Sequence, residues 1–315
     1  MESGKAEVLI LGPLMPQVIE EIEKNFSLHR LWQARDKDAL IAQVSPGLRL
    51  MAAGGAHPTV DADFLSRFPK LEIISSFGVG YDHIDAKAAA KRGVVVTNTP
   101  DVLNEEVADT ALGLLLCTVR ELPQAERYLR AGKWLERDYP LTATLRDRTV
   151  GIVGLGRIGK AIARRLDAFA VPVVYFGRNR QEGVSYRYYA DLIAMARDVD
   201  ILIVVTPGGP ATRHLIDAAV LEALGPKGIL INVARGSVVD EAALIHALRE
   251  KTILSAGLDV FADEPRVPKE LIGMENVVLL PHIGSASVYT RQAMGRLVVD
   301  NLLSWAAGKG PLTPV

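Results

Sequence analysis

The feature that most constrains the fold of this chain is the glycine-rich stretch GLGRIG at residues 154–159. It lies between the apolar run TVGIV and the run RIGKAIARRLDAF, so the pattern predicts a strand, a tight turn and a helix. Gly154 would allow the turn, Gly156 would let the backbone approach a pyrophosphate, and Gly159 would let helix and strand pack closely. The helix would offer unpaired N–H groups to the phosphates. The sequence therefore predicts a dinucleotide site, with a purely structural turn as the alternative.

Strand-like runs alternate with helical patterns along the whole chain, which predicts parallel βαβ units and an α/β fold. We expect two series of strands, at 7–12, 49–55, 71–78 and 93–98, and then at 149–154, 171–177, 200–206, 228–234, 253–260 and 276–282. Helical patterns cover 104–131, interrupted near Pro123, and 287–308. With 315 residues the chain is long for one core. We therefore expect a first domain at 1–99, a nucleotide domain at 100–284, and a tail, 285–315, that returns to the first domain.

Composition excludes several other classes of protein. The net charge of -1 gives no reason to expect nucleic acid or an anionic membrane as a partner. The single cysteine, Cys117, excludes an intrachain disulfide and a thiolate metal cluster, and is expected to be a core residue. No apolar run approaches 18 residues, and the N-terminus MESGKAEVLILG lacks the features of a signal peptide. We expect a cytoplasmic protein.

The residues after the second strand of the nucleotide domain bear on the choice of cofactor. A site for NAD usually ends this strand on an acid that holds the ribose hydroxyls. Here Gly177 is followed by Arg178, Asn179 and Arg180, and the next acid, Glu182, lies beyond the strand. Arg178 and Asn179, with help from Arg180, could bind a 2′-phosphate that an acid would repel. We therefore expect NADPH to be preferred and NADH to be the weaker cofactor, with a solvated basic turn as the alternative.

Three polar residues follow strands at the same edge of the predicted nucleotide-domain sheet: Arg235, Glu264 and His282. Each has an ordinary alternative role: Arg235 as a surface cation, Glu264 as a loop acid, and His282 as a hydrogen-bonded histidine at a domain junction. The carboxyl ends of strands border the ligand crevice of an open α/β sheet. Together, the three residues therefore predict an active site.

Six segments in order resemble the D-2-hydroxyacid dehydrogenase family along nearly the whole chain: SSFGVGYDHID, VTNTPDVLNEEVADTALGLLL, VGIVGLGRIGKAIA, LGPKGILINVARGSVVDEAALIHAL, AGLDVFADEP and LLPHIGSAS. AGKWLERDYPLTA and the C-terminal PLTPV are most similar to the branch of glyoxylate/hydroxypyruvate and hydroxyphenylpyruvate reductases.

The resemblance implies a Rossmann nucleotide domain and a flavodoxin-like substrate domain in an enzyme that reduces 2-ketoacids by hydride transfer from NAD(P)H. It implies that His282 donates a proton to the keto oxygen, that Glu264 is its partner, and that Arg235 binds the carboxylate and the keto oxygen. Backbone N–H groups of Val79 and Gly80 would also hold the carboxylate. No metal is implied. The expected cofactor contacts are Gly154, Leu155, Gly156, Arg157, Ile158, Gly159, Gly177, Arg178, Asn179, Thr206, Val233, Asp259, Gly284 and Thr110.

Two departures from the family pattern affect the expected pockets. TPGGPATRHLI at 206–216 replaces the more common CPLTPETRHLI, which loosens a loop near the expected adenine pocket. Ala53, Gly54, Gly55 and Ala56 place almost no bulk beside the substrate, with Gly54 as the key position. We expect glyoxylate and hydroxypyruvate to be substrates and the larger phenylpyruvates to be accepted as well.

The family resemblance also predicts a homodimer formed through residues 104–145. The helical part of this region carries an apolar face made of Val107, Ala111, Leu114, Leu115 and Thr118. An extended arm follows the helical part and contains Trp134 and Tyr139. Burial within one chain is the alternative. A second function also stays open at this point, a non-catalytic corepressor or scaffold that senses nucleotide with the same fold.

Overall fold

The computed structural model describes residues 5–54 and 58–315. The chain forms two compact units, one made of Met1–Leu103 with Ser287–Val315 and the other of Asn104–Ala286. We call them unit 1 and unit 2. The divisions fall a few residues beyond those expected from the sequence, at 99/100 and 284/285.

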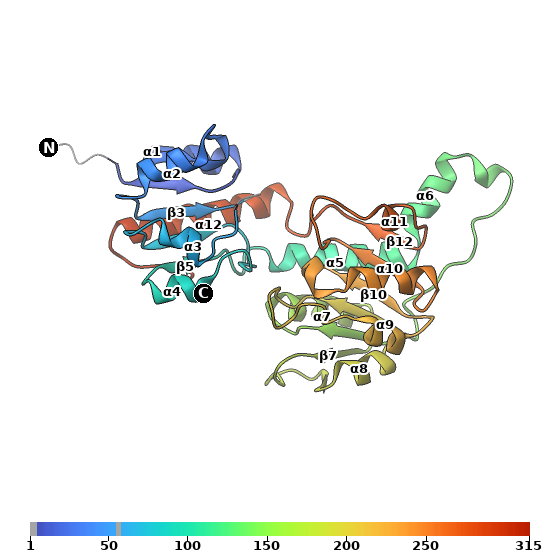
Figure 1. Ribbon diagram of the computed structural model, residues 1–315. Helices are drawn as coiled ribbons and strands as arrows, with labels where there is room; N and C mark the ends of the chain where they lie inside the picture. Colours follow the sequence, from blue (N-terminus) through green and yellow to red (C-terminus); the bar gives the residue numbers. More distant parts are fainter. Residues whose placement is uncertain (1–4, 55–57) are drawn as a thin grey trace. The chain divides into compact units, whose positions relative to one another are not determined.

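Unit 1 is built around a five-stranded parallel sheet with the strand order β2-β1-β3-β4-β5. This is the flavodoxin-like order, in which the chain reverses direction across the sheet between β1 and β3. Its elements are β1 Glu7–Ile10, α1 Pro16–Asn25, β2 Ser27–Arg30, η1 Leu31–Gln33, α2 Lys37–Val44, β3 Leu50–Ala53, α3 Ala62–Ser66, β4 Ile73–Ser76, α4 Ala86–Lys91, β5 Val95–Thr97 and α12 Val288–Ala306. Helices α1, α2, α3, α4 and α12 of this unit are labelled in Figure 1.

Alternation along the strands of unit 1 gives its sheet two buried faces. Val8 and Ile10 belong to a core with α1 and α12, whereas Leu9 and Leu11 belong to a core with α2 and α4. Successive side chains of a strand point to opposite faces, so the apolar runs need a helix layer on each side. The unit is therefore a three-layer α/β/α structure.

Unit 2 contains a seven-stranded parallel sheet with the order β12-β11-β10-β9-β6-β7-β8. The strand order reverses between β6 and β9, and ligands of such sheets bind at this point, outside the carboxyl ends of the strands. Its elements are α5 Asn104–Val119, α6 Leu122–Arg130, η2 Lys133–Leu135, β6 Val150–Val153, α7 Arg157–Ala168, β7 Val173–Phe176, β8 Arg187–Tyr189, α8 Leu192–Asp198, β9 Ile201–Val204, α9 Ala218–Leu224, β10 Ile229–Asn232, η3 Gly236–Val238, α10 Glu241–Arg249, β11 Ser255–Leu258, α11 Lys269–Ile272 and β12 Val277–Leu279.

Local sequence determines where many helices begin. The residue before the first turn accepts a hydrogen bond from the backbone N–H three positions on, which satisfies a group that the helix itself leaves unpaired. These caps are Asp36, Asp61, Asp85, Asp191, Asp217, Asp240 and Ser287. In the described part of the chain, no helix combines the length and apolar character needed to cross a membrane.

The α/β fold class with two parallel sheets is confirmed, but two strands were missed. β2 (SLHR) and β8 (RYY) were not expected, and each lies at the edge of its sheet. An edge strand has one neighbour and tolerates polar residues, so it lacks the continuous apolar run that identified the other strands.

Helix α5 corrects one part of the expected dimer surface. The five residues of its apolar face are at most 8% exposed, and the helix packs against α7 and β11 of the same unit. Thr118 would lie 2.4 Å from a Cβ placed on Gly257 of β11, so the contact is close. This face is used within the chain and is not available to a partner.

Candidate active site

The glycine-rich turn between β6 and α7 has the geometry that each of its expected roles requires. Gly154 has φ +104, and a Cβ there would lie 3.0 Å from the Thr206 backbone. A Cβ on Gly159 would lie 2.2 Å from the Gly154 carbonyl oxygen, so helix and turn can approach only without a side chain. A Cβ on Gly156 would meet nothing within 4 Å, so its backbone faces open space. The first turn of α7 is therefore accessible to an anion.

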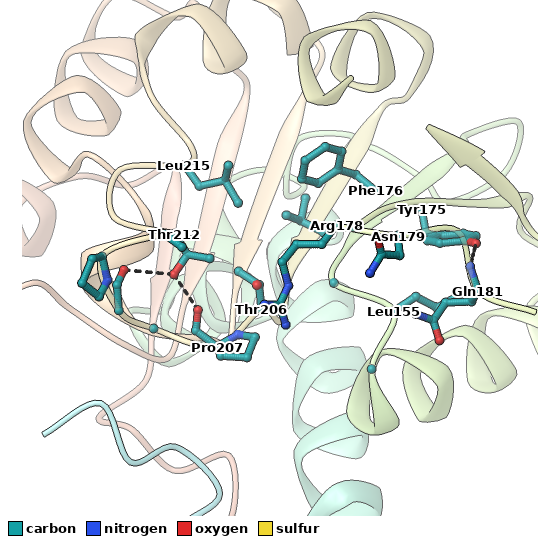
Figure 2. Close-up of a pocket in the computed structure, with 18 residues that line it drawn as sticks. Leu155, Tyr175, Phe176, Arg178, Asn179, Gln181, Thr206, Pro207, Thr212 and Leu215 are labelled. Carbon is teal, nitrogen blue, oxygen red and sulfur yellow. Dashed lines mark hydrogen bonds between the residues drawn. The ribbon is translucent and has the colours of Figure 1, made fainter. Parts of the chain in front are cut away.

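A pocket of about 460 Å³ opens beside this turn. Figure 2 shows Arg178, Asn179 and Thr206 among the side chains that surround it. The pocket gathers seven of the expected cofactor residues: Gly154, Leu155, Gly156, Gly177, Arg178, Asn179 and Thr206. Its lining does not include Arg157, Ile158, Gly159, Val233, Asp259, Gly284, Thr110 or the assisting Arg180. No acidic side chain is among the lining residues, which suits a phosphate next to Arg178.

Two tyrosine hydroxyls hold the loop that carries Arg178 and Asn179. The Gln181 N–H donates to the Tyr175 hydroxyl at 2.7 Å (Figure 2), and the Tyr188 hydroxyl donates to the Gly177 carbonyl at 3.2 Å. Tyr175 is 1% exposed. Neither tyrosine was expected from the sequence, since their position in β7 and β8 gives no sign of what their hydroxyls reach. Gln181 also lines the pocket and was missed.

The 206–216 loop forms the opposite wall of the pocket, and its unusual sequence does not leave it without support. The Thr212 hydroxyl donates to the Pro207 carbonyl at 2.7 Å and to the Gly209 carbonyl at 3.3 Å (Figure 2). The Thr212 N–H also donates to the Gly209 carbonyl, at 3.1 Å. Gly209 has φ +119, a backbone conformation that favours glycine. These bonds form a compact turn where the sequence suggested a loosened loop.

Arg235, Glu264 and His282 follow β10, β11 and β12, which are neighbours in the sheet. His282 Nδ1 lies 2.7 Å from Glu264 Oε2, and the other carboxylate oxygen accepts the Phe261 N–H at 3.0 Å. The charge of Arg235 also acts on the Glu264 carboxylate. The structure thus brings the three residues together within unit 2.

The Glu264 carboxyl is ionised in this arrangement. Burial opposes its ionisation, but the hydrogen bonds from His282 and Phe261 outweigh burial, so its pKa lies below the usual range of a glutamate. An ionised carboxylate only accepts hydrogen bonds, so we assign the proton of this contact to Nδ1 of His282. The His282 side chain is 45% exposed, which leaves Nε2 free to act on a ligand.

The loop that presents His282 is shaped by Asp259, which had been expected among the cofactor contacts. Asp259 is 2% exposed and accepts the N–H groups of Ile283 and Gly284 at 2.7 and 2.8 Å. Burial raises the pKa of the Asp259 carboxyl, and the two backbone bonds oppose this shift only in part. His282 itself has φ +54, an uncommon conformation for a residue other than glycine. The hydrogen bonds that Asp259 accepts from Ile283 and Gly284, the two residues after His282, hold this turn in place.

Arg235 is supported in a similar way. Asn232, 1% exposed at the end of β10, accepts the Ala234 N–H at 3.0 Å and donates to the Arg235 carbonyl at 3.1 Å. Two more of the expected cofactor residues lie close to these loops. The Thr110 hydroxyl donates to the Gly284 carbonyl at 3.3 Å, and Val233 follows β10 directly.

In unit 1, the loop that is expected to bind the substrate carboxylate contains Val79 and Gly80 and follows β4. Residues 98 and 99 hold two carbonyl groups of this loop. The Thr99 N–H donates to the Gly78 carbonyl and the Asn98 side chain donates to the Val79 carbonyl, both at 2.9 Å. In a planar trans peptide the N–H points away from the C=O. The N–H groups of Val79 and Gly80 therefore both point away from the 98–99 segment. Two successive N–H groups that point in the same direction can both donate to one anion.

Gly54, the key position of the expected substrate-size loop, has no room for a side chain of its own. A Cβ on Gly54 would lie 2.2 Å from Leu14 Cδ2 and 3.2 Å from Phe77 Cβ. The space beside Gly54 is thus filled by Leu14, which comes from the loop after β1, and a larger residue would displace it. Gly55 and Ala56, named with Gly54 in this expectation, lie outside the described residues.

The fold, the pocket beside the glycine-rich turn, and the set of Arg235, Glu264 and His282 define a two-domain α/β dehydrogenase. A family model described as D-isomer specific 2-hydroxyacid dehydrogenase, NAD binding domain, matches residues 112–284. The chain is 47% identical over 308 residues to glyoxylate/hydroxypyruvate reductase A of Arabidopsis thaliana and 45% identical over 308 residues to hydroxyphenylpyruvate reductase of Plectranthus scutellarioides. Both alignments cover 98% of this chain and 98% of the relative.

A solved structure is also similar over almost the full length. The NADPH-dependent glyoxylate/hydroxypyruvate reductase of Sinorhizobium meliloti, in complex with NADP and malonate, gives a TM-score of 0.92 at 50% identity. The match covers 99% of this chain and 97% of that one. The chain belongs to the D-isomer specific 2-hydroxyacid dehydrogenase family.

Proposed function

We propose that this protein reduces glyoxylate and hydroxypyruvate to D-2-hydroxyacids, with NADPH as its preferred cofactor. The observation that carries the proposal is the contact of 2.7 Å between His282 and an ionised Glu264, next to Arg235. An acid held by a carboxylate beside a planar cation suits the protonation of a keto oxygen in an anionic substrate. The relatives described above act on such ketoacids by name.

The two units would divide the work. Unit 2 would bind the nucleotide, as the match of residues 112–284 to an NAD binding domain supports. Gly154, Gly156 and the first turn of α7 would hold its pyrophosphate, and Arg178 and Asn179 its 2′-phosphate. When bound, NADPH supplies the hydride. Unit 1 would bind the substrate carboxylate through the N–H groups of Val79 and Gly80.

The remaining steps belong to residues of unit 2. The Arg235 guanidinium would hold the carboxylate and stabilise negative charge that develops on the keto oxygen. His282 would donate its Nε2 proton to that oxygen. Glu264 would fix the orientation of the ring by accepting a hydrogen bond from Nδ1.

The direct test is an assay of NADPH oxidation with glyoxylate, hydroxypyruvate and hydroxyphenylpyruvate side by side. We expect turnover of the first two. Groups that bind only the carboxylate and the keto oxygen cannot discriminate side chains, so we also propose that the aromatic ketoacid is accepted. Because Leu14 fills the space beside Gly54, Leu14→Ala is the variant expected to improve aromatic substrates. Absence of turnover with every 2-ketoacid would contradict the proposal and favour a corepressor or scaffold.

We expect Glu264→Gln to shift the pH dependence of kcat. The pKa of the wild-type Glu264 carboxyl is lowered in the folded protein. The ionised carboxylate therefore stabilises the fold at pH values above the usual glutamate pKa. This stabilisation is lost only as the pH falls through the lower pKa of the folded state. Glutamine keeps one of the two acceptor oxygens, which can still receive the bond from His282, but removes the negative charge beside the ring. In pH–rate profiles, the loss of kcat on the alkaline side should therefore begin at a lower pH in Glu264→Gln than in the wild type.

Asp263→Asn provides the control for this profile. Asp263 is in the same loop, but its carboxylate pairs with Arg266 at 2.6 and 2.7 Å and both side chains are exposed. Its loss should leave the profile unchanged. Superimposable profiles for Glu264→Gln and the wild type would remove the charge of Glu264 from the mechanism.

We also propose a homodimer formed through α6 and the arm that follows it, rather than through α5. The arm is folded against α6, where the Tyr139 hydroxyl donates to Glu121 at 2.8 Å and the Tyr128 ring packs edge-on against Tyr139. Helix α6 and the arm nevertheless expose several large apolar side chains: Leu122 49%, Leu129 56%, Trp134 63%, Leu135 94% and Leu141 101%. Such a cluster marks an association surface, and two-fold dimers are the commonest closed assembly.

We expect light scattering at micromolar concentration to give twice the chain mass of 34.1 kDa. Leu135→Glu should lower the measured mass to that of one chain, because it places a charge in the apolar surface. Ile272→Glu changes an apolar residue of α11 that is 63% exposed and should leave the mass unchanged. A wild-type mass near one chain would contradict the dimer. The cytoplasmic location stays a prediction, which cell fractionation can test.

A further inference from the structure

Asn98, the residue that holds the Val79 carbonyl, is itself held by Thr313 from the 311–315 segment. The Asn98 N–H donates to the Thr313 carbonyl at 3.2 Å, and the Thr313 hydroxyl donates to the Asn98 carbonyl at 2.6 Å. The contact continues along β5, with an antiparallel bridge between Thr97 and Pro314 and a bond of 3.1 Å from the Val315 N–H to the Val96 carbonyl. The 311–315 segment therefore pairs with the outer side of β5, at the edge of the unit 1 sheet.

The position of Thr313 is determined in turn by Asn301 of α12, which is 0% exposed. The Asn301 side-chain oxygen accepts the Leu312 and Thr313 N–H groups at 3.0 and 3.2 Å. Its NH₂ group donates to the Leu297 carbonyl at 2.8 Å and to the Thr313 hydroxyl at 3.0 Å. All four hydrogen-bonding positions of the amide are used. A fully satisfied buried amide specifies one arrangement of the groups around it.

The Thr313 hydroxyl is thus the link between two networks. It accepts from Asn301 and donates to Asn98, and the Asn98 side chain donates to the Val79 carbonyl. Because the Val79–Gly80 peptide is planar, the bond to its carbonyl also determines the direction of the Gly80 N–H. Every residue of this chain of bonds belongs to unit 1.

We propose that Thr313 is a positioning residue for the substrate-binding loop, and that the 311–315 segment forms part of the substrate site without touching the substrate. The proposal rests on the proposed function, in which the Val79 and Gly80 N–H groups bind the ketoacid carboxylate. It gives the PLTPV sequence a role that the resemblance alone did not supply.

Loss of the hydroxyl has a specific kinetic consequence. Asn98 would keep the bond from its N–H to the Thr313 carbonyl but would lose the bond to its own carbonyl. Its side chain would be held less firmly, so the Gly80 N–H would spend part of its time away from the direction that the carboxylate needs. Ground-state binding of the ketoacid would weaken, while the nucleotide pocket, which lies wholly within unit 2, would be unchanged. The effect should therefore fall on KM for the ketoacid more than on kcat.

The test compares Thr313→Val, which keeps the shape but removes the hydroxyl, with Thr313→Ser, which keeps the hydroxyl. We expect KM for glyoxylate to rise about tenfold in Thr313→Val, the worth of one hydrogen bond in a fixed geometry. The dissociation constant for NADPH, measured by fluorescence titration, should not change. Thr313→Ser should restore KM to near the wild-type value.

Ser304→Ala is the matched control. The Ser304 hydroxyl donates to the Gly310 carbonyl at 2.7 Å, so this variant weakens the attachment of the same segment without touching Asn98 or Asn301. It should lower the unfolding temperature but leave KM unchanged. If Thr313→Val does not fold, Asn98→Asp tests the next link, because a carboxylate of the same shape cannot donate to the Val79 carbonyl.

Three outcomes separate the proposals. A raised KM in Thr313→Val with a normal KM in Ser304→Ala supports the positioning role. A wild-type KM in Thr313→Val, or in Asn98→Asp where that variant replaces it, overturns the positioning role and leaves the reductase intact. A wild-type protein that turns over no 2-ketoacid overturns both proposals.

Discussion

His282→Ala is expected to lower kcat by roughly 10²–10⁴, the usual contribution of a positioned proton donor. The imidazole is held by Glu264 at 2.7 Å and is 45% exposed, so its other nitrogen can reach a ligand. NADPH should bind nearly as well as to the wild type, because His282 does not line the pocket beside the glycine-rich turn. Single-turnover reduction of glyoxylate and a fluorescence titration with NADPH measure the two effects separately.

His214→Ala is a closely matched control for this variant. His214 also has a positive φ, +50 against +54 for His282, and its side chain is 44% exposed. It also lies near a carboxylate, 3.8 Å from Asp240, but at that distance the contact is not a hydrogen bond. Near wild-type turnover is expected. Near wild-type turnover in His282→Ala as well would remove this histidine from the mechanism.

The wild-type protein is expected to prefer NADPH over NADH by at least about tenfold in kcat/KM, and Arg178→Ala is expected to lose this preference. A hydrogen bond to a charged group contributes roughly 1.5–3 kcal/mol, and only the 2′-phosphate of NADPH would receive it here. Activity with NADH should change little. Steady-state kinetics with both cofactors at a saturating ketoacid concentration give the ratio.

Arg180→Ala controls for a general effect of positive charge. Arg180 is exposed and lies two positions away, but it is not among the residues that line the pocket. Its loss should leave most of the preference intact. Equal use of both cofactors by the wild type would contradict the assignment of Arg178, and an equal effect of the two substitutions would mean that the turn acts only through its net charge.

The parts of the site that the sequence predicted are those that a local pattern encodes. The glycine-rich turn was recognisable because its roles depend on backbone conformation at fixed spacing, which Gly154 and Gly159 show directly. Arg235, Glu264 and His282 could be placed at one edge because the carboxyl ends of parallel strands meet there.

The parts that were missed depend on contacts between distant residues. Leu14 fills the space beside Gly54, and Thr313 meets Asn98 across a separation of 215 residues. No periodicity or spacing in one sequence reports such a pair. β8 was missed for a different reason, because an edge strand of polar residues resembles a loop.

Tyr175 and Tyr188, which hold the loop that carries Arg178, bear on how readily this enzyme could change its cofactor during evolution. Their hydroxyls bind main-chain atoms of Gly177 and Gln181, and neither bond involves the side chains of Arg178 and Asn179. The bonds that shape the loop thus do not depend on which side chains occupy positions 178 and 179. An acid could replace Arg178 without altering the bonds that hold the loop. If Arg178 binds the 2′-phosphate as proposed, replacement of this one residue would change the cofactor preference while the structure of the loop is kept.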